Sequence, residues 1–157
     1  MSEYRVLVVE DSPTMRQLIV FALKRIRNLH IEEAGDGVGG LKKLSAQKFD
    51  LVVTDINMPI MDGLELVKTI RKKDSKTPIV MVTAHTDKEY LLSAVELHLE
   101  QYIVKPINLK ELKSVLEKCL VVIGKNQAVT KELPLGYSYD FDHKILGLPV
   151  SLLALLL

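Results

Sequence analysis

Five short apolar runs recur at nearly even spacing along the chain, and they constrain the fold more than any other feature. The runs cover residues 5–9, 30–34, 51–54, 79–83 and 102–104. Four of them are dominated by β-branched or aromatic residues, which suit strands. The first, third and fourth show little alternation of apolar and polar residues, which is typical of strands in a parallel sheet that is covered on both faces.

Segments with helical periodicity separate these runs. Ser12 and Pro13 form a helix N-cap followed by proline at the first helical position, and apolar residues then recur at helical spacing as far as Ile26. Similar stripes predict further helices over residues 63–73, from Thr86 or Asp87 to about residue 97, and from the cap Asn108 to about residue 119.

The segment 37–46 predicts only a short or frayed helix, because Gly39 and Gly40 each cost a helix about 1 kcal/mol relative to alanine. Strand and helix nevertheless alternate five times before about residue 122. This alternation predicts an α/β fold, a doubly wound sandwich with right-handed crossovers.

Polar side chains follow or end the predicted strands. Glu10 and Asp11 follow the first strand, Asp55 follows the third, Thr83 ends the fourth, and Lys105 follows the fifth. Ligands of open α/β sheets bind beyond the carboxyl ends of the strands, so these groups should meet at one edge. Each has a structural explanation too: Asp11 as a helix cap, Thr83 as a strand former and Lys105 as a solvated lysine. Their joint placement favours a functional site.

The chemistry of this set indicates phosphoryl transfer. Three crowded carboxylates repel one another, and Mg²⁺ relieves that repulsion because it takes oxygen ligands and leaves positions open for phosphate oxygens. Lys105 supplies a positive charge for a phosphoryl group, and Asp55 is a candidate covalent acceptor.

The charge balance and the single cysteine limit the other classes of protein. The chain has 21 Lys and Arg against 20 Asp and Glu, a formal net charge of +1, which argues against a nucleic-acid binder with a basic excess over the whole chain. Cys119 cannot form an internal disulfide, which fits a reducing, cytoplasmic compartment. The N-terminus has no apolar signal core, and the uncharged residues 145–157 are too few to span a bilayer, so we expect no membrane association.

At this point residues 3–122 resemble the receiver domain of bacterial two-component response regulators, a family with a flavodoxin-like fold and a five-stranded parallel sheet in the order 2-1-3-4-5. The family's motifs are an acidic pair, a phosphoacceptor Asp, Thr-Ala, a strand-five aromatic and Lys-Pro. Here these are Glu10-Asp11, Asp55, Thr83-Ala84, Tyr102 and Lys105-Pro106.

The resemblance implies a role for each of these residues. Asp55 would accept a phosphoryl group from a sensor histidine kinase. Mg²⁺ would be held by Glu10, mainly through water, by Asp11 and Asp55, and by the main-chain carbonyl of Asn57.

The remaining motif residues would bind the phosphoryl group and respond to it. Lys105 would pair with a phosphoryl oxygen, and the small Ala84 would leave the group accessible. Thr83 would move toward the phosphoryl and Tyr102 would rotate inward, so that the surface of helix four, strand five and helix five switches. The Lys105-Pro106 bond would be cis.

Two positions depart from the family pattern. His98 stands where the family usually has a glycine after helix four, which puts the geometry of that helix end in doubt. Gly40 stands where the family usually has alanine, which weakens helix two. Neither departure concerns the phosphorylation site.

We expect a receiver domain over residues 1–122, a linker over 123–135 and an extension over 136–157. The extension loosely resembles the opening of the effector domain in winged-helix regulators of the OmpR/PhoB type, and an unrelated extension is the alternative. A regulator truncated there would lack the groove-reading helix, so DNA binding is not expected. The uncharged end would pack on the receiver or support a homodimer or tail-mediated self-association.

The rival reading is an Mg²⁺-dependent phosphatase with an aspartate nucleophile. Such enzymes usually carry a second aspartate two residues after the nucleophile as acid and base, and Asn57 occupies that position here. The sequence therefore favours a signalling phosphoacceptor that is not an enzyme in the usual sense.

Overall fold

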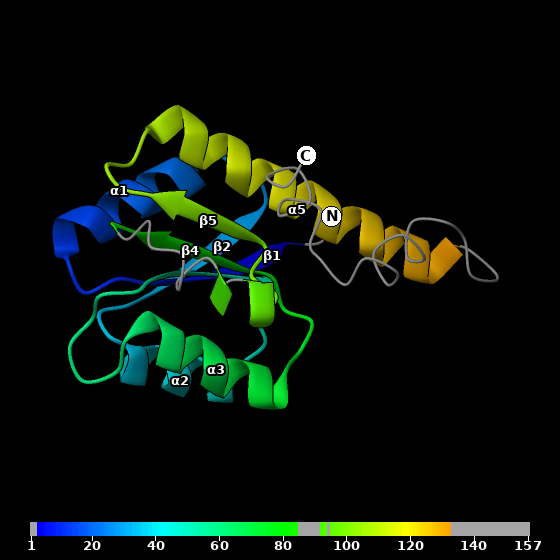
Figure 1. The fold of residues 1–157 in the computed structure, drawn as a ribbon. Coiled ribbons are helices and arrows are strands. Elements are labelled where there is room, and N and C mark those ends of the chain that lie inside the picture. Colours follow the sequence, from blue (N-terminus) through cyan, green and yellow to red (C-terminus); the bar gives the residue numbers. More distant parts are fainter. Residues whose placement is uncertain (1–2, 85–91, 94, 133–157) are drawn as a thin grey trace.

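The structure is a computed structural model that describes residues 3–84, 92–93 and 95–132 (Figure 1). Five strands form one parallel sheet in the order β2-β1-β3-β4-β5. The strands are β1 (Tyr4–Val9), β2 (Leu29–Ala34), β3 (Leu51–Asp55), β4 (Ile79–Thr83) and β5 (Gln101–Val104). The helices with assigned bounds are α1 (Pro13–Lys24), α2 (Gly37–Ala46), α3 (Gly63–Lys73) and α5 (Leu109–Glu132). The predicted fold and strand order are confirmed.

Helices cover both faces of the sheet, with α1 and α5 on one face and α2 and α3 on the other (Figure 1). Alternate residues of β1 therefore enter different cores: Val6 and Val8 pack toward α1 and α5, whereas Leu7 and Val9 pack toward α2 and α3. All four are fully buried. The absence of alternation in the sequence of β1 is explained by this two-sided burial.

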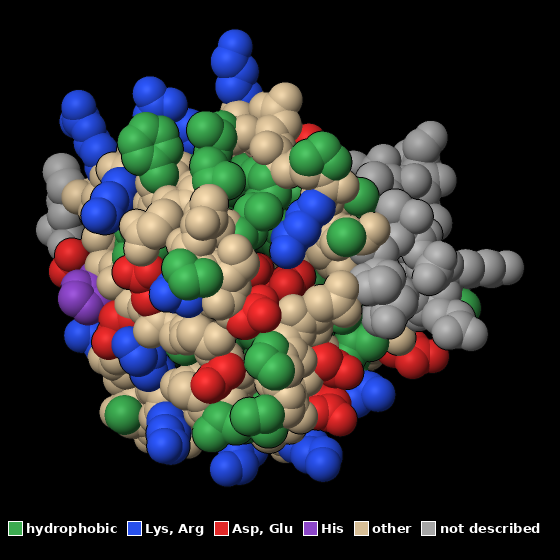
Figure 2. All heavy atoms as spheres, turned by 90° about the vertical axis from the view of Figure 1, so that its left-hand side faces the viewer, with side chains coloured by type: hydrophobic (Ala, Val, Ile, Leu, Met, Phe, Trp, Pro, Cys, Tyr) green, Lys and Arg blue, Asp and Glu red, His purple; other side chains and the backbone are tan. Residues whose placement is uncertain are grey.

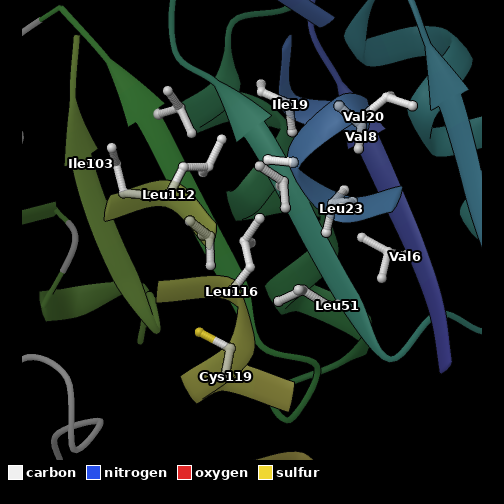
Figure 3. Packing of buried hydrophobic residues seen from close by; sticks show 14 of the residues in the cluster. Val6, Val8, Ile19, Val20, Leu23, Leu51, Ile103, Leu112, Leu116 and Cys119 are labelled. Atoms are coloured by element: carbon white, nitrogen blue, oxygen red, sulfur yellow. The ribbon is translucent and has the colours of Figure 1, made fainter. Parts of the chain in front are cut away.

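The core between the sheet and α5 is built from one stripe of that helix. Leu112, Leu116 and Cys119 belong to one buried cluster with strand residues, and Figure 3 shows Leu112 near Ile103 and Leu116 near Leu51. Because α5 packs through this stripe, the strand β5 and the loop that follows it are held against the domain.

Polar side chains cap the N-termini of α1, α5 and α3. The Oγ of Ser12 accepts a hydrogen bond from the N–H of Met15 at 3.3 Å, and Asn108 Oδ1 accepts one from the N–H of Lys110 at 2.9 Å. Both caps were predicted from the sequence. A third cap was not: the Oδ1 of Asp62 accepts from the N–H of Glu65 at 2.8 Å at the start of α3.

Where we expected a short or frayed helix, α2 spans the whole segment Gly37–Ala46, ten residues. Asp36 caps it, with Oδ1 accepting from the N–H of Gly39 at 2.6 Å. A Cβ atom on Gly40 would lie 3.0 Å from Cγ2 of Val9. The glycine thus lets the helix lie close against β1, and this packing outweighs its low helix propensity.

Helix α5 does not end near residue 122, where we expected a linker to begin. It continues as helix to Glu132. Gly124 costs about 1 kcal/mol, which does not stop a helix whose following residues include good helix formers such as Lys125 and Ala128. The predicted extension 136–157 lies outside the described residues. Within the described residues, no helix has the length and apolar character that a membrane crossing needs.

The helix predicted from Thr86 or Asp87 lies largely outside the described residues, but the segment that ends it is described. His98 has a φ of 54°, the left-handed conformation that the family provides with glycine. The guanidinium of Arg71, on α3, donates to the carbonyl oxygens of Leu97 and His98 at 2.8 and 3.1 Å. Arg71 thereby satisfies carbonyl groups that a helix end leaves without partners.

Candidate functional site

The end of β1 and the end of β3 bring three carboxylates together. In the parallel pairing of these strands Val9 lies opposite Thr54, so Glu10, which follows β1, and Asp55, the last residue of β3, are neighbours. One carboxylate oxygen from each of Glu10, Asp11 and Asp55 lies within 4.8 Å of the others. Figure 2 looks onto this edge of the sheet and shows acidic side chains gathered near its centre, with a basic side chain beside them.

Two of these carboxylates are buried and the third is exposed. Glu10 is 1% and Asp55 2% accessible, whereas Asp11 faces solvent. The Nζ of Lys105 lies 3.3 Å from Oδ1 of Asp55 and 3.7 Å from Oε2 of Glu10. The predicted convergence of strand-end groups is therefore present in the geometry.

The burial of Glu10 beside Asp55 makes the charged form of its carboxyl unfavourable. Burial raises the pKa of its carboxyl from 4.5 to about 7, and the charge of Asp55 adds to the rise while Lys105 opposes it. Among the described residues, the buried Oε2 of Glu10 has no hydrogen-bond partner. The ammonium of Lys105, 3.7 Å away, offsets part of the cost of burying this oxygen, and a bound cation would offset more of it.

The donor set fits a hard divalent cation. It consists of carboxylate oxygens, which suit Mg²⁺, and it contains no sulfur or imidazole ligand that would favour a softer metal. Asp11 and Asp55 would hold such an ion directly, and Oε2 of Glu10, which has no hydrogen bond, would face it or one of its water ligands. The exposed Asn57, two residues after Asp55, lies on the same loop.

The other predicted residues occupy the ends of β4 and β5. Thr83 is fully buried, and its carbonyl oxygen accepts a hydrogen bond from the N–H of Lys105 at 2.7 Å. Ala84 is exposed beside the site. The Lys105-Pro106 peptide bond is cis.

Tyr102 lies opposite Met81 in the pairing of β4 with β5. Its side chain is only 8% accessible and belongs to the core cluster that packs toward α2 and α3. The ring therefore lies inside the protein in this structure.

Sequence reasoning missed two features of the site. Ile60, in the loop between β3 and α3, is 89% accessible and has a φ of 71°. Arg16, on α1, donates a hydrogen bond to the main-chain oxygen of Glu10. The aspartate motif could have drawn attention to Ile60 because it lies within that loop, but the contact of Arg16 depends on tertiary structure.

The family model of the response regulator receiver domain matches residues 6–117. The chain belongs to the response regulator receiver family. Receiver domains are signalling proteins of two-component systems, and this is the class that the strand-end residues had indicated.

Individual members of the family extend the comparison. The receiver is 37% identical over 116 residues to chemotaxis protein CheY-3 of Vibrio cholerae, which covers 73% of this chain and 89% of that protein. It is similar to the structure of CheY4 of Vibrio cholerae, with a TM-score of 0.69, 32% identity and coverage of 75% and 99%. It is also similar to TrrA of Thermotoga maritima in complex with Mg²⁺-BeF, with a TM-score of 0.66, 36% identity and coverage of 76% and 99%.

Proposed function

We propose that this receiver accepts a phosphoryl group on Asp55 from a histidine kinase and thereby switches a partner-binding surface. The observation that carries the proposal is the cluster of Glu10, Asp11 and Asp55 with the Nζ of Lys105 3.3 Å from Asp55 Oδ1. A buried carboxylate, a cation at contact distance and two further carboxylates are what a phosphoryl acceptor needs.

In the proposed reaction an oxygen of Asp55 attacks phosphorus, and the bond from phosphorus to the donor nitrogen breaks. Lys105 pairs with a phosphoryl oxygen and balances part of its charge. The exposed Ala84 leaves room for the donor to approach. Mg²⁺, held by Glu10, Asp11, Asp55 and the carbonyl of Asn57, would supply charge neutralisation and alignment. The complex of TrrA with Mg²⁺-BeF supports this assignment, because that relative has 36% identity to this chain.

The proposed switch passes through β4 and β5. The hydroxyl of Thr83 gains the phosphoryl group as a hydrogen-bond partner. Phosphorylation then favours the conformation in which the ring of Tyr102 is buried. Because Thr83 and Lys105 are joined through the 2.7 Å main-chain hydrogen bond, a shift of the β4 end is transmitted to β5. The surface formed by the fourth helix, β5 and α5 would then bind a partner or a second copy.

Phosphoryl labelling tests the proposal. The purified chain is incubated with Mg²⁺ and acetyl phosphate, and intact mass followed by peptide mapping locates the added group. We expect one phosphoryl group on Asp55, and no label without Mg²⁺ or in Asp55→Asn. Asp50→Asn is the matched control, because Asp50 directly precedes β3 at its opposite end. Equal labelling of wild type and Asp55→Asn would contradict the proposal.

Incubating the protein with Mg²⁺ and a phosphate monoester, beside the labelling by acetyl phosphate, separates the phosphatase alternative. A phosphatase would release phosphate repeatedly from a monoester, whereas a receiver would be labelled once and lose the group slowly. The exposed Asn57 in place of an acid–base aspartate leaves the second outcome favoured.

A further inference from the structure

The main-chain oxygen of Glu10 is held by a side chain that the proposed reaction does not use. The Nη1 of Arg16 donates to this oxygen at 2.7 Å, and the Nε of the same guanidinium donates to Oε1 of Glu33 at 3.2 Å. Gln17 Nε2 donates to the same Glu33 oxygen at 3.2 Å. Arg16 therefore joins the end of β1 to β2 through two differently directed hydrogen bonds.

The carbonyl of Glu10 belongs to the same planar peptide unit as the nitrogen of Asp11. A hydrogen bond to that carbonyl thus sets the orientation of the plane from which Asp11 departs. The Glu10 residue is held on its other side as well, since its N–H donates to the oxygen of Ala34 at 3.1 Å. Residues at the end of β2 consequently hold Glu10 from both sides, directly through Ala34 and indirectly through Glu33 and Arg16.

Asp11 needs such support more than the other two carboxylates. Glu10 and Asp55 are buried, so packing restricts their side chains. Asp11 is exposed, and its position depends on the backbone that carries it. Two hydrogen bonds restrain that backbone: Arg16 donates to the carbonyl before Asp11 at 2.7 Å, and the N–H of Ser12 donates more weakly to Oε1 of Glu10 at 3.3 Å.

We propose that Arg16 is a positioning residue that orients Asp11 for a divalent cation, with Glu33 as its anchor. This inference rests on the proposed function of the site. It also explains why arginine stands at this position: the guanidinium has donors in a rigid fork that can meet two acceptors at once, whereas a lysine ammonium offers a single centre.

The alternative is that Arg16 and Glu33 form only a surface ion pair. Their side chains are 21% and 39% accessible, and exposed pairs contribute only about 0–1 kcal/mol to stability. A purely structural pair would change the free energy of unfolding slightly and leave cation affinity unchanged. Cation affinity therefore distinguishes the two readings.

The test measures the dissociation constant for Mg²⁺ by isothermal titration calorimetry of the full chain. We expect Arg16→Met to weaken Mg²⁺ binding about tenfold, as removal of groups that orient metal ligands commonly does, and Arg16→Lys to lie between Arg16→Met and wild type. Arg27→Met is the matched control, because Arg27 is exposed beyond the end of α1. At saturating Mg²⁺ the rate of labelling by acetyl phosphate should return to nearly the wild-type value.

A second readout needs no metal. In the metal-free protein the ¹H–¹⁵N resonance of the Asp11 amide should shift in Arg16→Met and in Glu33→Ala, and should stay in place in Arg27→Met. If Arg16→Met does not fold, Arg16→Lys and Glu33→Ala carry the test. An Mg²⁺ dissociation constant within twofold of wild type in the folded Arg16 and Glu33 variants would overturn the inference. If wild type itself neither binds Mg²⁺ nor is labelled, the proposed function fails, and an unmoved Asp11 resonance would overturn the positioning role separately.

Discussion

A Cβ atom on Gly63 would lie 1.9 Å from the main-chain oxygen of Asp55. The first residue of α3 therefore lies directly against the backbone of the proposed phosphoacceptor. The N–H of Gly63 also donates to the oxygen of Ile56 at 2.8 Å, which holds the loop between β3 and α3 closed. Any side chain at this position must displace the strand end or the helix.

We expect Gly63→Ala to lower the free energy of unfolding by at least about 2 kcal/mol, because the clash is with backbone and cannot be relieved by a rotamer change. Urea denaturation monitored by circular dichroism measures this. Gly35→Ala is the control, since beyond its chain neighbours the nearest atom to its Cβ would be Nη1 of the Arg16 side chain at 3.5 Å, and it should stay within about 0.5 kcal/mol of wild type. Equal effects of the two substitutions would show that α3 can move away from Asp55.

The raised pKa of Glu10 predicts a pH dependence of stability in the metal-free protein. The pKa lies at about 7 in the folded state against 4.5 ordinarily, so the folded state binds the proton more tightly than the unfolded state. This contribution is fully present below pH 4.5 and is lost as the pH rises through 7. In EDTA, Glu10→Gln should therefore be more stable than wild type at pH 8 by about 1–3 kcal/mol, and the difference should shrink toward pH 5.

Chemical denaturation of both proteins at the two pH values checks this expectation. Adding Mg²⁺ should stabilise wild type more than Glu10→Gln, because the ion binds only the folded state and needs the carboxylate. A difference between the two proteins that is the same at pH 5 and pH 8 would contradict the account of Glu10.

Ile60 has a conformation that does not suit its side chain. Its φ of 71° is unfavourable for a β-branched residue, and at 89% accessibility the side chain recovers little by packing. The N–H of Met61 donates to the oxygen of Pro59 at 2.8 Å, so the tight turn is centred on Ile60. We expect Ile60→Asn and Ile60→Gly to stabilise the protein by about 1 kcal/mol. Ile60→Val keeps the branched Cβ and should not stabilise the protein. Thermal unfolding of the three variants and wild type measures these differences.

Cys119 should be unreactive in the folded protein. It is 4% accessible, and burial, assisted by the charge of Glu100, raises the pKa of its thiol to about 12. Reaction with a thiol-specific disulfide reagent at pH 8 should be slow in buffer and rapid in denaturant, because the reactive species is the thiolate. Rapid reaction under native conditions would show that α5 around Cys119 separates readily from the sheet.

Much of the fold follows from local patterns. Continuous apolar runs located the strands, and the caps Ser12 and Asn108 located the starts of two helices, because these signals depend on a few neighbouring residues. The convergence of Glu10, Asp55 and Lys105 also followed, since parallel strands share their carboxyl edge.

Other features depend on contacts between segments far apart in the sequence. Helix α2 is complete because Gly40 allows close approach to Val9, which no propensity scale records. Arg71, on α3, donates hydrogen bonds to the carbonyl groups of Leu97 and His98, which lie just before β5. The hydrogen bond of Arg16 to Glu10 likewise exists only after β1, β2 and α1 have packed.

Helix α5 has a mechanical consequence for whatever signal the receiver produces. It is 24 residues long, or about 36 Å at 1.5 Å per residue, and Leu112, Leu116 and Cys119 pack it on the sheet. A rigid rod that tilts about one end acts as a lever. A tilt of about 10° at its base would carry its far end through about 6 Å. A small displacement at the base of α5, next to β5 and Lys105, would thus move Glu132 by a larger distance, with no change in the helix itself.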